Sequence, residues 1–278
     1  MPATPSRCNQ HSTSLTSDAP MLPNTAPPLP GVRRHEPHMG TVIGIDIRDD
    51  RNPVELDHIL DQCFAEFARI EDVYSTFRPQ SVISRLGCGE LALEACDPEV
   101  REVLARCEKL RTDTQGAFDH RPVGGRVALD PAGVVKGWSV DTVGELLLAA
   151  DIHHWCINAG GDVACHGGSC PGRPWSIGVR HPFDAQAVAL VLEAPALCVA
   201  TTAIYERGNH LWGNAGPADY VSATVMGPEL WFADACAKVV WTTGPHGITW
   251  VTQHPEYDVA VMTAAGQLLT TPGVSSYR

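Results

Sequence analysis

Long hydrophobic runs are missing from this sequence. The most apolar stretch, Ala187 to Ala200, is interrupted by Glu193 and Pro195 and falls short of the roughly 20 residues that cross a bilayer. It predicts two short strands around a turn rather than a transmembrane segment. The start of the chain also lacks the charged, apolar and small-residue succession of a signal or lipoprotein segment, so we expect a cytoplasmic protein.

Positive charge is also scarce. The 278 residues include 20 Lys and Arg against 32 Asp and Glu, which gives a formal net charge of -12. An acidic surface argues against general nucleic-acid binding, which needs a positive field along the phosphates, but it leaves room for a local cationic pocket. With 44% hydrophobic residues, the chain can bury a sizeable core in one large domain or in two fused halves.

Closely paired cysteines are absent. The ten cysteines are scattered, which favours free thiols in a reducing compartment over a disulfide scaffold. One alternative is a metal-binding module built from Cys156, Cys165, His166 and Cys170. These four residues lack the Cys-x-x-Cys spacing of a structural zinc site, which argues against that alternative.

Residues 1–37 are rich in Pro, Ser, Thr and Asn and have no hydrophobic periodicity. Such a segment buries too little apolar surface to offset its ordering entropy, so we predict a disordered tail over residues 1–37. The folded domain is predicted over residues 38–278. It opens with a strand from Met39 to Ile47, and it contains no internal repeat.

Helical and strand patterns alternate along the rest of the chain. The clearest helix covers Pro53 to Val73, where apolar residues recur at spacings of three and four. Further helices are predicted from Asp97 to just before Gly116, from Lys136 to Ala150, and from Ala233 to Thr242. Strands are predicted over Trp155–Val163, Trp175–Arg180, Asp219–Met226, Asp258–Thr263 and Gln267–Thr271. This mixture predicts an α/β (α+β mixed) fold.

The segment from Gly133 to Gly137 is the first candidate for chemistry. A strand is predicted to end near Asp130 and a helix to begin near Lys136, with the two glycines at the join. Free N–H groups at a helix start attract phosphate, and Lys136 would add a positive charge. An ordinary strand-to-helix turn with a solvated lysine explains the same residues equally well.

Two further segments carry weaker signals. Gly160 and Gly161 lie between apolar strand halves, where a ligand close to the backbone or a simple tight turn would each require glycine. Asp234 stands among small residues at the head of a predicted helix. It could cap that helix, or its carboxylate could ligate a hard cation.

Taken in order, these segments resemble the FAD:protein FMN transferase (ApbE) family. The resemblance runs from His38 to the end of the chain. It is carried by Met39-Gly40-Thr41, Tyr74-Ser75-Thr76-Phe77 with Ser81 to Leu86, Gly116-Ala117-Phe118-Asp119, Gly133-Val134-Val135-Lys136-Gly137 with Asp141, Asn158-Ala159-Gly160-Gly161-Asp162, Ala200-Thr201-Thr202-Ala203 with Tyr205-Glu206-Arg207-Gly208, and Ala233-Asp234-Ala235. The resemblance implies an ApbE-like fold, a compact domain of two intertwined halves in which mixed sheets pack against helices.

The resemblance also implies an activity. Members of the family bind FAD and Mg²⁺, transfer FMN to a Thr or Ser hydroxyl of an acceptor flavoprotein, and release AMP. The FAD-binding residues that it implies are Met39, Gly40, Thr41, Ser75, Phe77, Asp119, Lys136, Asp141, Asn158, Gly160, Gly161 and Thr201. Met39 could equally be core filler, and Asp119 could simply cap a turn.

Three residues are implied as catalytic, namely His210, Asp234 and Lys136. His210 is the general-base candidate because imidazole titrates near neutral pH, although the Asp-Pro that usually follows such a histidine in the family is missing here. A non-catalytic loop histidine would explain the same residue.

The implied metal ligands include a clear departure from the family. They are the backbone carbonyl of Gly133, the carboxylate of Asp234 and, at the position where the family usually has threonine, Lys238. An ammonium group cannot ligate Mg²⁺. Either Lys238 turns away and leaves a weaker, water-completed metal site, or its ammonium group replaces the charge of the metal. The chain is therefore expected to be an active FMN transferase or, alternatively, a relative that binds or hydrolyses FAD without modifying a protein.

Overall fold

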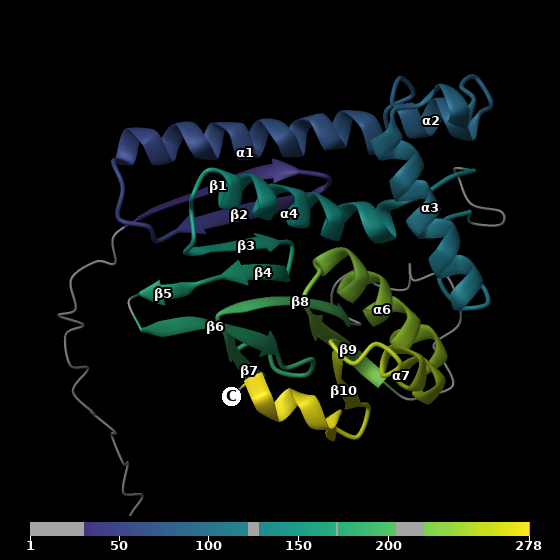
Figure 1. Cartoon of the computed structure of the whole chain (residues 1–278). Helices are drawn as coiled ribbons and strands as arrows, with labels where there is room; N and C mark the ends of the chain where they lie inside the picture. Colours follow the sequence, from purple (N-terminus) through teal and green to yellow (C-terminus); the bar gives the residue numbers. More distant parts are fainter. Residues whose placement is uncertain (1–30, 122–127, 171, 204–219, 278) are drawn as a thin grey trace, which may run out of the picture.

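The computed structural model describes residues 31–121, 128–170, 172–203 and 220–277 (Figure 1). Folded structure begins before the predicted boundary at residue 38, because β1 (Val32–His38) pairs with β2 (Thr41–Ile47). This strand escaped sequence analysis because it has almost no apolar residues and contains Pro37. Both features are tolerated at the edge of a sheet. Arg34 holds the strand in place through ion pairs with Asp57 and Asp61 on the neighbouring helix.

Eight strands form one antiparallel sheet in the order β1-β2-β3-β4-β8-β9-β10-β11. The strands beyond β2 are β3 (Trp155–Ala159), β4 (Asp162–His166), β8 (Ala196–Ala203), β9 (Tyr220–Gly227), β10 (Asp258–Thr263) and β11 (Leu268–Thr270). The single strand predicted over Trp155–Val163 is wrong. Gly160 and Gly161 have φ values of 64° and 105° and turn the chain between β3 and β4, as a two-residue hairpin turn requires.

Helices cover one face of this sheet, and α1 and α4 run along its strands (Figure 1). The helices are α1 (Pro53–Tyr74), α4 (Ala132–Ala149), α6 (Leu230–Thr243) and α7 (Pro245–Val251). The main core lies between these helices and the sheet, and it includes Ile45, Phe67, Val140, Val225 and Val240. Two helices, α2 (Val82–Gly87) and α3 (Pro98–Asp113), and the short 3-10 turn η1 (Leu93–Ala95) complete the described helical part. A second core joins α2 and α3 to α4 and α6.

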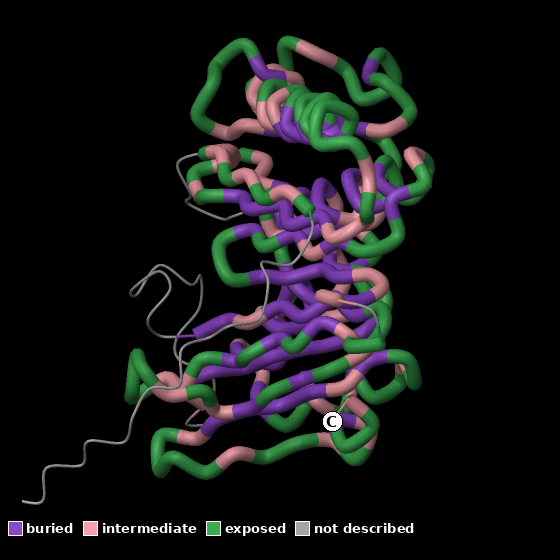
Figure 2. Tube along the Cα trace, turned by 90° about the vertical axis from the view of Figure 1, so that its left-hand side faces the viewer, coloured by how far each residue is buried: buried purple, intermediate pink, exposed green. Residues whose placement is uncertain are grey.

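A smaller sheet covers part of the opposite face. It contains β5 (Gly168–Cys170), β6 (Arg173–Arg180) and β7 (Val188–Ala194), and the C-terminal 3-10 turn η3 (Pro272–Tyr277) packs beside it. The turn predicted within Ala187–Ala200 occurs at Pro195, where the chain passes from β7 in the small sheet to β8 in the large one. Figure 2 shows the buried segments concentrated in the layered strands and the exposed ones at the turns. The predicted α/β (α+β mixed) class is confirmed, and every strand pair is antiparallel. In the part of the chain that the structure describes, no helix has the length and apolarity needed to span a bilayer.

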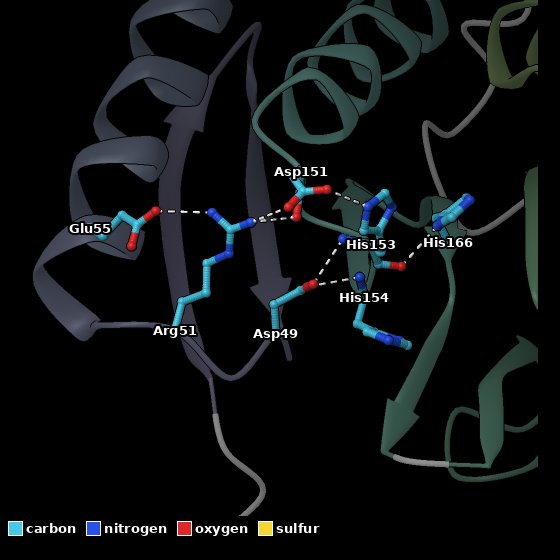
Figure 3. A network of polar contacts seen from close by, with 7 residues as sticks. All are labelled: Asp49, Arg51, Glu55, Asp151, His153, His154 and His166. Atoms are coloured by element: carbon cyan, nitrogen blue, oxygen red, sulfur yellow. Dashed lines mark hydrogen bonds and ion pairs between the residues drawn. The ribbon is translucent and has the colours of Figure 1, made fainter.

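A polar network fastens the end of the sheet where α1 begins and α4 ends (Figure 3). The carboxylate of Asp49 accepts hydrogen bonds from the backbone N–H groups of His153 and His154, at 2.9 and 2.8 Å. Arg51 contacts Asp151 at 2.7 Å and Glu55 at 2.9 Å. The connection before α1 is thereby joined to the connection after α4, which fixes both helices at one end of the sheet.

Helix α4 begins four residues earlier than predicted, at Ala132 instead of Lys136. Gly133 and Gly137 therefore lie inside its first turns and do not mark a strand-to-helix join. Gly137 is required for packing, because a Cβ atom there would lie 2.5 Å from the Cα atom of Trp231 and 2.6 Å from the carbonyl oxygen of Leu230. The absence of a side chain lets α4 and α6 approach closely.

We predict that Gly137→Ala destabilises the protein by about 1–3 kcal/mol, because the new methyl group forces α4 and α6 apart. Gly87→Ala is the matched control, since its Cβ would meet other atoms only at ordinary distances of 3.6 Å or more. Urea unfolding of both variants measures the difference. Equal stabilities for the two variants would contradict this account of the helix contact.

Candidate functional site

Four charged side chains from three elements meet beside the β3–β4 turn. Lys136 comes from α4, Asp162 from the start of β4, and Asp234 and Lys238 from successive turns of α6. The Lys136 ammonium group forms an ion pair with Asp162 and lies 3.7 Å from Asp234 Oδ2. Lys238 forms an ion pair with Asp234 Oδ1 and also donates to the Asp234 backbone carbonyl at 3.4 Å.

The two carboxylates lie behind the two ammonium groups. The side chains of Asp162 and Asp234 are 2% and 3% exposed, whereas those of Lys136 and Lys238 are 21% and 27% exposed. An anion that approaches from solvent therefore meets the lysines first. Burial raises the pKa of Asp162 above its usual value, and the nearby charge of Asp234 raises it further, while Lys136 and Lys238 oppose both effects.

Threonines hold Asp162 in place from the other side. The backbone N–H of Thr201 donates to Asp162 Oδ1 at 3.0 Å, and the hydroxyl groups of Thr201 and Thr224 lie 2.9 Å apart. Neither Asp162 nor Thr224 is among the predicted site residues. Asp162 was visible as the acid that directly follows two glycines, whereas nothing local marked Thr224.

A cavity of about 150 Å³ opens next to Lys136. Five of the predicted FAD-binding residues line it, namely Met39, Gly40, Ser75, Phe77 and Lys136. The other lining residues are Ile70, Glu71, Tyr74, Thr76, Ala132 and Val135. Met39 turns the chain between β1 and β2 with a φ of 51°, and its N–H donates to Glu71 at 3.0 Å. Phe77 is 78% exposed at the cavity wall. The lining combines apolar surface with one positive charge, Lys136, and one negative charge, Glu71.

A second cavity of about 530 Å³ lies on the other side of the β3–β4 turn, towards the small sheet. Its walls include the predicted residues Asn158, Gly160, Gly161 and Thr201, and part of β6. Asn158 Oδ1 accepts a hydrogen bond from the N–H of Gly161 at 2.9 Å, which stabilises the turn. Predicted residue Thr41 packs against Gly160, where a Cβ atom would collide with its hydroxyl group. The two turns, at Met39-Gly40 and at Gly160-Gly161, therefore lie side by side.

Asp141 is predicted to bind the cofactor, but in the structure it holds the start of α6. Its two carboxylate oxygens accept hydrogen bonds from the N–H groups of Leu230 and Trp231, at 2.8 and 2.9 Å. Helix α6 has no side-chain cap from its own N-cap residue, so Asp141 supplies it from α4. Burial raises the pKa of Asp141 to about 6, and these two hydrogen bonds oppose that rise.

Asp119, another predicted cofactor-binding residue, contacts two arginines. Its carboxylate accepts a hydrogen bond from the N–H of Arg121 at 2.8 Å and lies 3.3 Å from Arg111 Nε. These contacts are those of a turn cap, the alternative that sequence analysis left open. Of the predicted site residues, His210 falls outside the described part of the chain.

The predicted metal ligands do lie together, but the residues present do not fit Mg²⁺. Lys238 passes Gly133, since its Cδ atom is 3.9 Å from where a Gly133 Cβ would be, and its ammonium group lies on the Asp234 carboxylate. A divalent ion about 4 Å from an ammonium group is repelled by about 8 kcal/mol at an effective dielectric constant of about 20. Among the described residues, no group of three or more His, Cys, Asp or Glu could hold a metal ion.

The described residues do not favour the zinc alternative, because Cys156, Cys165, His166 and Cys170 form no group that could hold a metal ion. Cys156 and Cys165 face each other across β3 and β4, and burial raises the pKa of both thiols to about 12. His166 Nδ1 is bonded to the carbonyl of His153 at 2.8 Å.

Comparisons with known proteins agree with this fold. The sequence model of the ApbE family matches residues 39–123 and 120–262, and the chain belongs to the ApbE family. A FAD:protein FMN transferase of Vibrio cholerae serotype O1 is 30% identical over 80 residues, 28% of this chain and 24% of that protein. A FAD:protein FMN transferase of Rhodobacter capsulatus is 34% identical over 113 residues, 40% of this chain and 21% of that protein. Both alignments thus span under a quarter of the relative's length.

The fold itself matches over almost the whole chain. The solved structure of the flavin transferase ApbE from Vibrio cholerae superposes with a TM-score of 0.76 at 18% identity, covering 90% of this chain and 100% of that one. At this identity the likeness establishes the fold.

We predict that the stability of the protein depends on pH through Asp141. The folded-state pKa of about 6 lies above the ordinary value of 3.8, so the folded state favours the protonated carboxyl group. The resulting gain in folding free energy is complete below pH 3.8 and is lost as pH rises through about 6. From about pH 7 to about pH 5, the wild type should gain about 1 kcal/mol relative to Asp141→Asn, since one pKa unit corresponds to about 1.4 kcal/mol. Urea unfolding at both pH values tests this, and parallel pH dependences for the two proteins would exclude it.

Proposed function

We propose that this protein transfers FMN from FAD to a Thr or Ser hydroxyl group of an acceptor flavoprotein and releases AMP. The observation that carries the proposal is the pair of ammonium groups in front of two buried carboxylates, directly beside an apolar cavity. Membership of the ApbE family and the names of its relatives support the same activity.

The lysines, rather than the start of α4, are proposed to hold the pyrophosphate. The N–H of Ala132 is bonded to Asp130, and those of Val134 and Val135 are bonded to the carbonyl of Pro131. The first turn of α4 is thus largely satisfied and offers few donors to a phosphate. Lys136 lines the cavity, and its ammonium group lies beside Asp162 and Asp234.

An aromatic ring of FAD is proposed to occupy the cavity beside Lys136. Apolar walls from Met39 and Val135 would exclude water from the ring faces, and the exposed ring of Phe77 offers a surface for stacking. Lys136 at the end of this cavity then contacts the phosphate that follows the ring. The apolar surface and the ammonium group of Lys136 therefore match the two chemical parts of a nucleotide.

The proposed reaction is an in-line displacement at the FMN phosphorus. The acceptor hydroxyl oxygen forms the new P–O bond, the bond to the AMP oxygen breaks, and AMP departs with its pair of electrons. His210 is proposed to take the hydroxyl proton. Lys136 and Lys238 stabilise the negative charge that develops on the departing phosphate. Mg²⁺ is proposed to have at most a secondary role in the reaction, because the Lys238 ammonium group contacts the Asp234 carboxylate that would bind the ion.

The direct test is to incubate the protein with FAD and a cognate acceptor flavoprotein and to follow the acceptor by mass spectrometry. We predict a mass gain of one FMN and an equal yield of AMP. Lys136→Met should slow this transfer by at least about 100-fold, as expected for a group that stabilises transition-state charge. Lys109→Met, which removes an exposed lysine on α3, is the matched control and should transfer at the wild-type rate.

Two measurements keep this test informative. Lys136→Met leaves Asp162 without its cation, so thermal melting must show that the variant is folded, and Lys136→Arg should restore part of the rate. AMP release without a modified acceptor would favour the alternative, a relative that hydrolyses FAD. Wild-type transfer by Lys136→Met would exclude the proposed role of this lysine.

We also predict that His210→Asn lowers transfer by about 100-fold or more while FAD affinity changes by less than about threefold, because a general base acts on the proton in the transition state. Fluorescence titration with FAD measures the affinity, and the acceptor assay measures the rate. An equal loss in both quantities would instead assign His210 to binding.

A further inference from the structure

We infer that Lys238 supplies the positive charge that a divalent metal ion would otherwise supply at the pyrophosphate, so that this protein binds FAD without a metal. The inference rests on the proposed FAD site. It decides between the two arrangements that the sequence left open, because Lys238 does not turn away from Asp234.

The position of the Lys238 ammonium group is set by its contacts with Asp234 and by the course of its side chain beside Gly133. Lys238 follows Asp234 by one helical turn, so both side chains project from the same face of α6. The methylene part of the side chain passes Gly133, and the ammonium group contacts both the carboxylate and the backbone carbonyl of Asp234. Helix α6 is itself held against α4 through Asp141. The charge is therefore held in place by Asp234 on a helix whose own position is fixed.

The carboxylate of Asp234 already has a cation near each of its oxygens. Lys238 contacts Oδ1, and Lys136 lies 3.7 Å from Oδ2. A divalent metal ion on either oxygen would therefore lie close to an ammonium group, which would repel it. The negative charge that would attract Mg²⁺ is thus already offset by the protein's own cations.

The balance of charge in the cluster leads to the same conclusion. Two lysines offset two aspartates, so the cluster is formally neutral before any ligand binds. Without Lys238 it would carry one net negative charge and would attract a cation from solution. An ammonium group has three N–H donors, and the contacts with Asp234 engage two of them, so a phosphate oxygen can accept the third.

The test compares metal dependence in the wild type and in three variants of the full chain. Wild-type protein should bind FAD in EDTA within about threefold of its affinity in millimolar Mg²⁺, and should give no saturable heat when titrated with Mg²⁺ alone. Lys238→Met, which removes the charge at similar volume, should lose at least about tenfold in FAD affinity in EDTA, the size expected for a charge-assisted hydrogen bond. Lys238→Thr should lose affinity similarly in EDTA, regain it with Mg²⁺, and bind Mg²⁺ directly.

Lys109→Met is the control for charge removal and should match the wild type in every titration, while thermal melting confirms that each variant is folded. The inference is overturned if the wild type needs Mg²⁺ to bind FAD, if it binds Mg²⁺ saturably by itself, or if Lys238→Met keeps full FAD affinity in EDTA. Metal-dependent FAD binding with normal FMN transfer would reject this inference alone. Metal-free FAD binding without transfer would reject the proposed function alone, and no FAD binding under any condition would reject both.

Discussion

The contact between α4 and α6 is the constraint on which the site depends. Gly137 lets the two helices approach, and the buried carboxylate of Asp141 accepts hydrogen bonds from the first two N–H groups of α6. Burying a carboxylate is unfavourable, as the raised pKa of Asp141 indicates, and the helix N-terminus offsets that cost by stabilising the negative charge. Because Lys136 lies on α4 and Lys238 on α6, the distance between their charges follows from this single junction.

Burial of Asp162 and Asp234 explains why two lysines are present at the site. A buried carboxylate needs a cation or several hydrogen bonds, and each of these aspartates contacts a lysine. The carboxylates therefore orient the ammonium groups, which in turn face the solvent. This arrangement turns the ammonium groups of a formally neutral cluster towards solvent on a protein whose net charge is -12, and it suits one phosphate-bearing ligand better than a long polyanion.

The sheet contributes by placing two turns next to each other. The β1–β2 turn presents Met39 and Gly40, and the β3–β4 turn presents Gly160 and Gly161. Antiparallel pairing of β2 with β3 brings the turns together, because Ile43 is opposite Ala159. Residues that lie more than a hundred positions apart in sequence thereby border the same region as Lys136.

Local patterns in the sequence determined the long amphipathic helices and the order of motifs that marks the family, because periodicity and short motifs depend on near neighbours. Tertiary structure decided the rest. It revealed β1, which owes its place to pairing and to Arg34 rather than to apolar residues, and it moved the start of α4 to Ala132. It also assigned Asp141 to α6 and directed Lys238 onto Asp234. The sequence could name these charged residues, but the partner of a buried charge is chosen by packing between distant segments, which no local pattern encodes.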